Sequence, residues 1–368
     1  MSKFYSSLGL MSGTSADGVD ASIIQSDGDI EYKVILDKYF KYKQNIYENI
    51  HNLKDEINDV KDLTKLSSKI QFLEKEITLF HAEVVNKIIL EYKSDIDIVG
   101  FHGQTIFHNA KEKISKQLGD GKLLSQLTKK NVIYNFRQND LKNQGQGAPL
   151  TPIFHKLIKI KSKIKDVTFV NIGGITNITT ISNNNNMSGT DIGPGMCLID
   201  KWIRQKSKKN YDNNGIIAKS GKINQVALDK LIENFHKKEN ILSAGPVQSY
   251  DTKFFDFSFI RGLSLEDGAA TLTEFTAKII ISSIKTIDRY KGKIILCGGG
   301  RKNKFLVEKL KKESDRVKLI DEYKINGDFV ESQAFAYLAI RSYLKLPISF
   351  PETTGVKTAC TGGIFIKY

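Results

Sequence analysis

The sequence predicts an α/β protein with two domains. Its 368 residues exceed what one small hydrophobic core usually serves. An apolar stretch, a glycine-containing turn and a second apolar stretch open the chain, and the same order returns at residues 167–181. A late apolar strand at residues 293–297 leads directly into three glycines. The two halves are therefore predicted to begin with the same order of strand, turn and strand, although their sequences do not repeat.

The first turn has the composition of a phosphate-binding loop. Its glycines let backbone N–H groups approach an anion, and its hydroxyl side chains add donors. Carboxylates hold Mg²⁺ directly or through water, so Asp17 and Asp20 are the candidate metal ligands. An ordinary hairpin turn is the alternative interpretation. The candidate ATP-binding residues of this turn are Gly13, Thr14, Ser15, Ala16, Asp17, Gly18, Val19 and Asp20.

Helices and strands alternate along the rest of the chain. In the first half, apolar spacing predicts helices at 44–58 and 63–92 and strands at 96–101 and 131–134. In the second half it predicts strands at 167–172, 176–181, 293–297 and 317–320, and helices at 195–206, 224–236, 265–286, from 303, and at 329–345. The turn at 144–149 is the expected junction. The expected domains are residues 1–145 plus 355–368, and residues 146–354.

Composition and charge narrow the class of protein. There is no run of 18 apolar residues, which argues against a membrane span, and the N-terminus lacks the apolar segment of a signal peptide. Three widely spaced cysteines fit a reducing cytoplasm. The net charge is +14, but the lysines are scattered and no aromatic RNA-binding signature accompanies them. We therefore expect a solvated basic surface that attracts a small anionic substrate, without nucleic-acid binding. The sequence leaves open whether the protein forms a homodimer.

Ten short motifs follow one another along the chain. They are Met-Ser-Gly-Thr-Ser-Ala-Asp-Gly-Val-Asp (11–20), Gly-Phe-His-Gly-Gln-Thr (100–105), Gln-Leu-Gly-Asp-Gly (117–121), Gly-Gln-Gly-Ala-Pro-Leu (145–150), Asn-Ile-Gly-Gly-Ile-Thr-Asn-Ile (171–178), Asp-Ile-Gly-Pro-Gly (191–195), Asp-Gly-Ala-Ala-Thr-Leu-Thr (267–273), Cys-Gly-Gly-Gly-Arg-Lys-Asn (297–303), Glu-Ser-Gln-Ala-Phe-Ala (331–336) and Thr-Thr-Gly (353–355). Each motif alone is weak, whereas the ordered set spans nearly the whole chain. In this order, the motifs resemble those of the anhydro-N-acetylmuramic acid kinases of the actin–hexokinase superfamily.

The resemblance implies an actin/hexokinase-like fold of ribonuclease H-like halves, with a nucleotide cleft between the domains. It also implies an enzyme of cell-wall recycling that needs ATP and Mg²⁺. Members convert 1,6-anhydro-N-acetylmuramic acid, ATP and water into N-acetylmuramic acid 6-phosphate and ADP. One active site hydrolyses the internal ether and phosphorylates the freed oxygen.

The resemblance also assigns residues to the reaction. Asp191 matches the family's general base, with helix N-capping as the alternative. The glycine turns Gly173-Gly174 and Gly298-Gly299-Gly300 would face the phosphates and the adenosine, or be plain tight turns.

Four further residues are expected to contact the sugar. Arg137 would hold the lactyl carboxylate, because a guanidinium binds carboxylates with two parallel hydrogen bonds; a surface salt bridge is the alternative. Glu331 would face the sugar, or be a first-turn acid favoured by the helix dipole. His102 and Gln104 would line the cleft, with a structural role as the alternative for the histidine.

The chain departs from the family pattern at a few positions. Asn135 stands where members usually have Asp, Ile192 where they have Thr, and Met196 where they have Asn. A basic segment of the family appears here as residues 248–253, Gln-Ser-Tyr-Asp-Thr-Lys. These changes leave three hypotheses open: an active kinase on the anhydro sugar, a kinase on another amino sugar, and a nucleotide-dependent sugar sensor without catalysis.

Overall fold

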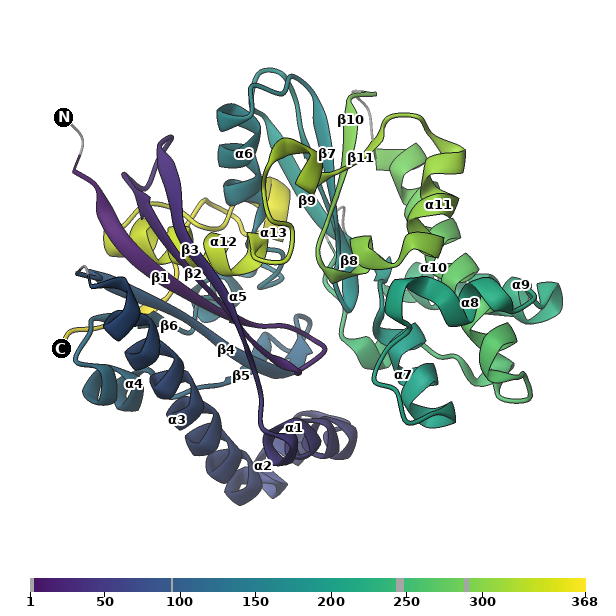
Figure 1. Cartoon of the computed structure of the whole chain (residues 1–368), viewed down its shortest axis with the longest axis horizontal. Coiled ribbons are helices and arrows are strands. Elements are labelled where there is room, and N and C mark those ends of the chain that lie inside the picture. Colours follow the sequence, from purple (N-terminus) through teal and green to yellow (C-terminus); the bar gives the residue numbers. More distant parts are fainter. Residues whose placement is uncertain (1–2, 94, 243–247, 288–290) are drawn as a thin grey trace. The chain divides into compact units, whose positions relative to one another are not determined.

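The computed structural model describes residues 3–93, 95–242, 248–287 and 291–368. The chain forms two compact units, one of Met1–Lys163 with Asp328–Tyr368 and the other of Ile164–Gly327 (Figure 1). Each unit is built around one β-sheet with helices packed against it. In the described residues, no helix is both long enough and apolar enough to cross a lipid bilayer.

The first sheet has the strand order β12-β6-β4-β1-β2-β3, with β5 paired to β4. The strands β1, β2 and β3 pair antiparallel, whereas β1, β4 and β6 run parallel. Their bounds are β1 Tyr5–Ser12, β2 Gly18–Ser26, β3 Tyr32–Lys41, β4 Ile98–Asn109, β5 Ile114–Leu118, β6 Val132–Tyr134 and β12 Ile364–Ile366.

The second sheet repeats this arrangement with the order β11-β10-β7-β8-β9. Here β7, β8 and β9 pair antiparallel, and β7, β10 and β11 run parallel. The bounds are β7 Val167–Ile172, β8 Ile175–Ile181, β9 Met187–Pro194, β10 Lys293–Cys297 and β11 Val317–Leu319. Three antiparallel strands followed by two parallel ones, twice over, are the ribonuclease H-like halves of an actin/hexokinase-like fold. The predicted α/β fold class is confirmed.

The helices of the first unit cover both faces of its sheet. Alternate residues of β1 point to opposite faces: Leu8 and Leu10 join the core with α3, while Gly9 faces α12. A Cβ at Gly9 would lie 2.0 Å from the carbonyl oxygen of Ser332, so only glycine allows α12 to approach this closely. The helices are α1 Gln44–Glu56, α2 Val60–Lys65, α3 Ser67–Tyr92, α4 Gly121–Thr128, α5 Gln138–Lys142, α6 Pro152–Lys161, α12 Val330–Tyr343 and α13 Pro351–Thr354.

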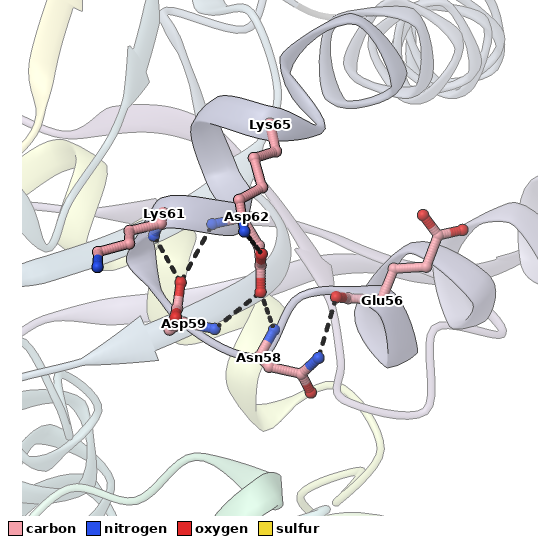
Figure 2. A network of polar contacts seen from close by, with 6 residues as sticks. All are labelled: Glu56, Asn58, Asp59, Lys61, Asp62 and Lys65. Atoms are coloured by element: carbon pink, nitrogen blue, oxygen red, sulfur yellow. Dashed lines mark hydrogen bonds and ion pairs between the residues drawn. The ribbon is translucent and has the colours of Figure 1, made fainter.

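A capping box separates α1 from α2 (Figure 2). The Asp59 carboxylate accepts the backbone N–H groups of Lys61 and Asp62, at 2.8 and 3.2 Å. The Asp62 carboxylate accepts those of Asn58 and Asp59, at 2.9 and 3.2 Å. These backbone donors, together with Lys65, lower the pKa of Asp62. The predicted helix 44–58 therefore ends at Glu56, because the chain satisfies the N-terminus of a new helix from that point.

The helices of the second unit pack around its sheet and form an apolar cluster that includes Trp202, Leu228 and Phe275. They are α7 Cys197–Lys206, α8 Ile216–Ser220, α9 Gln225–Leu242, α10 Leu265–Ile287 and α11 Lys304–Glu313. Trp202 of α7, the only tryptophan of the chain, is 1% exposed in this cluster, and its indole N–H donates to the Leu265 carbonyl at 2.9 Å.

The division into units differs from the expected boundaries, 1–145 plus 355–368 against 146–354. Residues 146–163 and 328–354 belong to the first unit. Helix α6 is held there by Phe154, whose ring centroid lies 5.3 Å from that of Tyr32 and 5.7 Å from that of Tyr337. The turn at 144–149, expected as the junction, is bonded into the first unit: Gln146 donates its N–H to the Thr354 carbonyl at 2.7 Å.

Four histidines, three of them buried and His108 half-buried, make the first unit sensitive to acid. Burial lowers the pKa of His81 to about 4 and those of His108 and His155 to about 3, and that of His102 lies well below 6.5. Below pH 6.5 the unfolded chain takes up protons that the folded unit cannot. The free energy of unfolding therefore falls as the pH drops from 6.5 towards the pKa that each histidine has in the folded unit. Each histidine contributes a loss of up to about 1.4 kcal/mol for every pH unit.

We predict that acid unfolds the first unit before the second. Between pH 7 and 4, circular dichroism should lose helix and strand signal before the fluorescence of Trp202 changes. The variant His81→Leu should shift the first transition to lower pH, whereas His236→Leu, at an exposed site, should not. Coincident transitions in the wild type, or no shift with His81→Leu, would contradict this account.

Candidate active site

The first glycine turn joins β1 to β2, as the sequence predicted. Residues 13–17 form the connection, with Ala16 at φ +53° and its N–H donating to the Gly13 carbonyl at 3.1 Å. The Gly13 carbonyl also accepts the side-chain amide of Gln104 at 3.0 Å, and the Thr14 carbonyl accepts the Lys54 ammonium at 3.2 Å. A trans peptide plane holds its N–H opposite its C=O. The Thr14 amide therefore points away from Gln104 and the Ser15 amide away from Lys54, which leaves them available to an anion.

Two more carbonyls of this turn are held in the same way. His51 Nε2 of α1 lies 3.1 Å from the Ser15 carbonyl. The Asp17 carbonyl accepts the Tyr39 hydroxyl at 3.0 Å and the Tyr42 backbone N–H at 2.9 Å. The sequence analysis missed His51 and Lys54 as partners of the turn, because their helix follows the turn by about thirty residues and shows only an ordinary amphipathic pattern.

Gln104 supports the first glycine turn from within the protein. It is fully buried; its amide nitrogen donates to Gly13, and its oxygen accepts from Ser12 Oγ at 2.8 Å. Ser12 Oγ also contacts the Gly18 carbonyl at 2.8 Å and the Tyr42 hydroxyl at 2.9 Å. A serine has one proton to donate, here shared by two acceptors, so Tyr42 is the donor to Ser12. The structure thus places Gln104 behind the turn, where burial leaves it no surface for a sugar.

The carboxylates at and beside the turn could supply one or two of the ligands of a Mg²⁺ ion. Asp17 lies on the turn and accepts Ser15 Oγ at 2.6 Å, whereas Asp20 lies within β2, opposite Met11 and Tyr39. No group of three or more His, Cys, Asp or Glu side chains within the described part of the chain is arranged to hold a metal ion. Mg²⁺ bound with a nucleotide needs only one or two carboxylates, because phosphate oxygens and waters complete its shell. The donor set therefore fits magnesium bound together with a nucleotide.

The second glycine turn, Gly173-Gly174, joins β7 to β8 and is also held by its carbonyls. The Gly174 carbonyl accepts the N–H groups of Gly195 and Cys197 at 2.9 and 3.2 Å, and the Gly173 carbonyl accepts that of Met196 at 2.8 Å. A Cβ at Gly195 would lie 2.2 Å from the Gly173 oxygen. The glycine that ends the Asp-Ile-Gly-Pro-Gly motif therefore lets the start of α7 close against the turn.

Asp191 lies in strand β9, which the sequence analysis did not expect. It is 8% exposed, and its carboxylate accepts the Tyr250 backbone N–H at 3.0 Å. Its own N–H donates to the Gln248 carbonyl at 3.0 Å. Helix α7 begins only at Cys197, so Asp191 is not a helix cap. A buried carboxylate oriented by backbone donors can serve as a general base.

The third glycine segment follows β10 and is braced by an ion pair. Gly298 has φ +77°, and its carbonyl accepts Arg301 Nη1 at 3.1 Å. The same guanidinium bonds Asp321 with both of its remaining nitrogens, at 2.7 and 2.9 Å, which lowers the pKa of that carboxyl. A Cβ at Gly299 would meet no atom within 4 Å, so this is the accessible point of the segment.

Arg137 is fixed by its neighbours in the first unit. His102 Nε2 accepts Arg137 Nε at 3.3 Å and Nη2 at 2.9 Å, and the Gly147 carbonyl accepts Nη1 at 2.8 Å. Burial and the adjacent guanidinium hold the pKa of His102 well below 6.5, so its neutral ring donates Nδ1–H to Gly103 and accepts from Arg137. His102 also borders a cavity of about 290 Å³, together with Gln117 and Asn135.

Glu331 lies in the first turn of α12 and is half-buried. Its neighbours Ser332 and Gln333 bond the strands beneath the helix: Ser332 Oγ lies 2.6 Å from Ser22 Oγ, and Gln333 Nε2 donates to both Asp37 oxygens at 3.1 Å. Of the predicted residues, the first unit holds the first turn, His102, Gln104, Arg137 and Glu331, and the second holds Asp191 and both later glycine segments.

We predict that Ser12→Ala destabilises the chain and weakens ATP binding. The substitution leaves buried polar groups at the first glycine turn unsatisfied, which costs about 1–3 kcal/mol of unfolding free energy. Ser7→Ala is the matched control, because Ser7 lies in the same strand and its buried hydroxyl has no hydrogen-bond partner among the described residues. Urea unfolding and the KM for ATP measure both effects. Equal losses for the two variants would contradict the role given to Ser12.

A family model for anhydro-N-acetylmuramic acid kinase matches residues 5–367. A protein of that name from Pelagibacter ubique (strain HTCC1062) is 55% identical over 377 residues, covering 100% of both chains. Another of the same name from Agrobacterium fabrum is 33% identical over 379 residues, again covering 100% of both.

A solved structure, the (R)-2-hydroxyglutaryl-CoA dehydratase component A of Acidaminococcus fermentans, aligns with 93% of this chain and 100% of its own at 12% identity and a TM-score of 0.47. The fold assignment rests on strand order and not on that remote likeness. The full-length family match and the identities show that the chain belongs to the anhydro-N-acetylmuramic acid kinase family.

Proposed function

We propose that this protein is an ATP-dependent kinase that converts 1,6-anhydro-N-acetylmuramic acid and water into N-acetylmuramic acid 6-phosphate, in cell-wall recycling. The observation that carries the proposal is the full-length match to relatives named for this activity, at up to 55% identity among those compared. The carbonyl-anchored glycine turns and the buried Asp191 supply the positioning and the base that such a reaction needs.

The chemistry begins with one proton transfer. Asp191 accepts a proton from a water molecule, whose oxygen forms a bond to the anomeric carbon C1 as the bond from C1 to O6 breaks. The electron pair of that bond stays on O6. O6 then forms a bond to the γ-phosphorus, the bond to the bridging oxygen breaks, and ADP leaves. A positioned general base typically contributes about 10²–10⁴-fold to the rate.

The phosphate turns supply the donors for ATP. The outward amides of Thr14 and Ser15 bind phosphate oxygens, with Gly173 and Gly174 as the second turn, and the backbone at Gly299 lies against the adenosine. Asp17 would hold Mg²⁺, directly or through water, and the ion would supply positive charge beside the phosphates.

The sugar would be held from the first unit. Arg137 pairs with the lactyl carboxylate, because His102 and Gly147 fix the plane of its guanidinium. Glu331, at the start of α12, faces the sugar hydroxyls. The net charge of +14 favours the arrival of both anionic substrates. Three free cysteines, at 197, 297 and 360, fit a cytoplasmic enzyme.

The departures from the family pattern are compatible with an active enzyme, because the altered residues fit the fold. Ile192 is buried in an apolar cluster with Ile280 and Leu296, so a hydroxyl there has no evident partner. Asn135 has φ +58°, a left-handed conformation that Asn adopts readily. Two hydrogen bonds join residues 248–250 to Asp191 through backbone atoms, the N–H of Tyr250 and the carbonyl of Gln248, and side-chain changes preserve them.

We predict that Asp191→Asn lowers turnover by at least about 100-fold while ATP still binds, because an amide cannot accept the proton. Coupled ADP release with the anhydro sugar, ATP and Mg²⁺ measures turnover, and calorimetry measures nucleotide binding. Asp212→Asn is the matched control: Asp212 is 3% exposed and accepts backbone N–H groups from Ile217 and Ala218, both at 2.9 Å.

Near-wild-type turnover of Asp191→Asn would remove that residue as the base. ADP release by the wild type with an ordinary amino sugar, but not with the anhydro sugar, would establish the other kinase. Tight binding of both ligands without product would establish the sensor.

A further inference from the structure

Two of the sequence motifs touch neither substrate in the mechanism above. They are the turn at 145–150 and Thr-Thr-Gly at 353–355. Both lie in the first unit and meet at one side chain, Asp140 of α5. Asp140 is 1% exposed, and burial raises the pKa of its carboxyl above the ordinary value.

The Asp140 carboxylate joins the two motifs. One oxygen accepts the Gly147 backbone N–H at 2.6 Å, and the other accepts the Thr354 hydroxyl at 2.5 Å. The Asp140 carbonyl accepts the Gly145 N–H at 2.9 Å. A Cβ at Gly145 would lie 2.1 Å from the carboxylate, so the turn can wrap the acid only with glycine there. The turn is therefore shaped around a single buried acid.

The same turn holds Arg137. Gly147 gives its N–H to Asp140 and receives Arg137 Nη1 on its carbonyl, at 2.8 Å. His102 holds the other side of the guanidinium, so these contacts use three of its five N–H donors. A continuous hydrogen-bonded chain thus runs from Thr354 through Asp140 and Gly147 to Arg137. If the turn moved, the guanidinium would lose its contact with the Gly147 carbonyl.

We propose that Asp140 is a positioning residue that sets the preference for a carboxylate-bearing sugar by fixing Arg137 through Gly147. Asp140 touches neither substrate. It fixes the turn whose carbonyl orients the guanidinium, and bidentate pairing with a carboxylate depends on that orientation. The inference rests on the proposed function, because it needs Arg137 to meet the lactyl carboxylate.

The test compares two bicyclic sugars, with and without the lactyl carboxylate: 1,6-anhydro-N-acetylmuramic acid and 1,6-anhydro-N-acetylglucosamine. The readout is the ratio of their kcat/KM values in coupled ADP release. Arg137→Met should lower this ratio by about 10–100-fold, as expected for the loss of a charged hydrogen bond. Asp140→Ala should lower it by about tenfold, and the double variant should fall no lower than Arg137→Met, because both changes remove the same interaction.

Two conservative variants keep the test decisive if Asp140→Ala does not fold. Asp140→Asn can still accept from Gly147 and donate to Thr354, so it should retain the ratio. Thr354→Val removes one anchor of the carboxylate without changing shape, and should lower the ratio by a few-fold. Asp59→Ala is the control, because it removes another carboxylate that accepts two backbone N–H groups in this unit and should leave the ratio unchanged.

The outcomes separate this inference from the function on which it rests. A wild type that releases no ADP with 1,6-anhydro-N-acetylmuramic acid would overturn the proposed function, whereas one that turns over both sugars equally well would overturn this inference. A loss with Arg137→Met, but unchanged ratios with Asp140→Ala and Thr354→Val, would overturn this inference alone. Additive losses in the double variant would do the same.

Discussion

The proposed chemistry depends on backbone carbonyls that the protein holds from behind. In the first unit, Gln104 and Lys54 bond the carbonyls of the turn after β1. In the second unit, the start of α7 bonds the carbonyls of Gly173 and Gly174. A carbonyl fixed inward fixes the opposite N–H outward, so each turn presents donors before any ligand arrives. Donors that need no rearrangement stabilise developing charge most effectively, which suits phosphoryl transfer. Two sheets of the same strand order place these turns at equivalent positions, each after the first strand of its sheet.

Backbone geometry also explains why the departures from the family pattern are tolerable. The backbone amide of Tyr250 donates to the carboxylate of Asp191, the proposed base, and this contact does not depend on which side chains residues 248–253 carry. Asn135 occupies a left-handed conformation that suits it. Ile192 completes an apolar cluster. Asp140 also acts through the backbone. Its buried carboxylate accepts the Gly147 N–H, and the Gly147 carbonyl accepts the Arg137 guanidinium.

Local pattern predicted much of the fold, because strand–turn–strand units and long amphipathic helices leave short-range signals. The family resemblance, rather than periodicity, supplied the reaction and Asp191. What the sequence could not reveal depends on contacts between distant residues. Gln104 was expected at the sugar, yet it supports a turn 91 residues earlier. The unit boundaries were misplaced because Asp140 bonds Thr354, 214 residues later, and so draws the glycine turn into the first unit. Strand β9 was missed because glycine and proline break its alternation.

The central claim is that one carboxylate activates water at C1 while O6 receives the phosphoryl group. Mass spectrometry of the product made in oxygen-18 water, quenched before the anomeric hydroxyl exchanges with solvent, tests it most directly. The account predicts one label on the sugar, at C1, and an unlabelled O6 that carries the phosphate. A phosphorylated product without label and with its anhydro ring intact would show simple phosphoryl transfer, and would contradict the account.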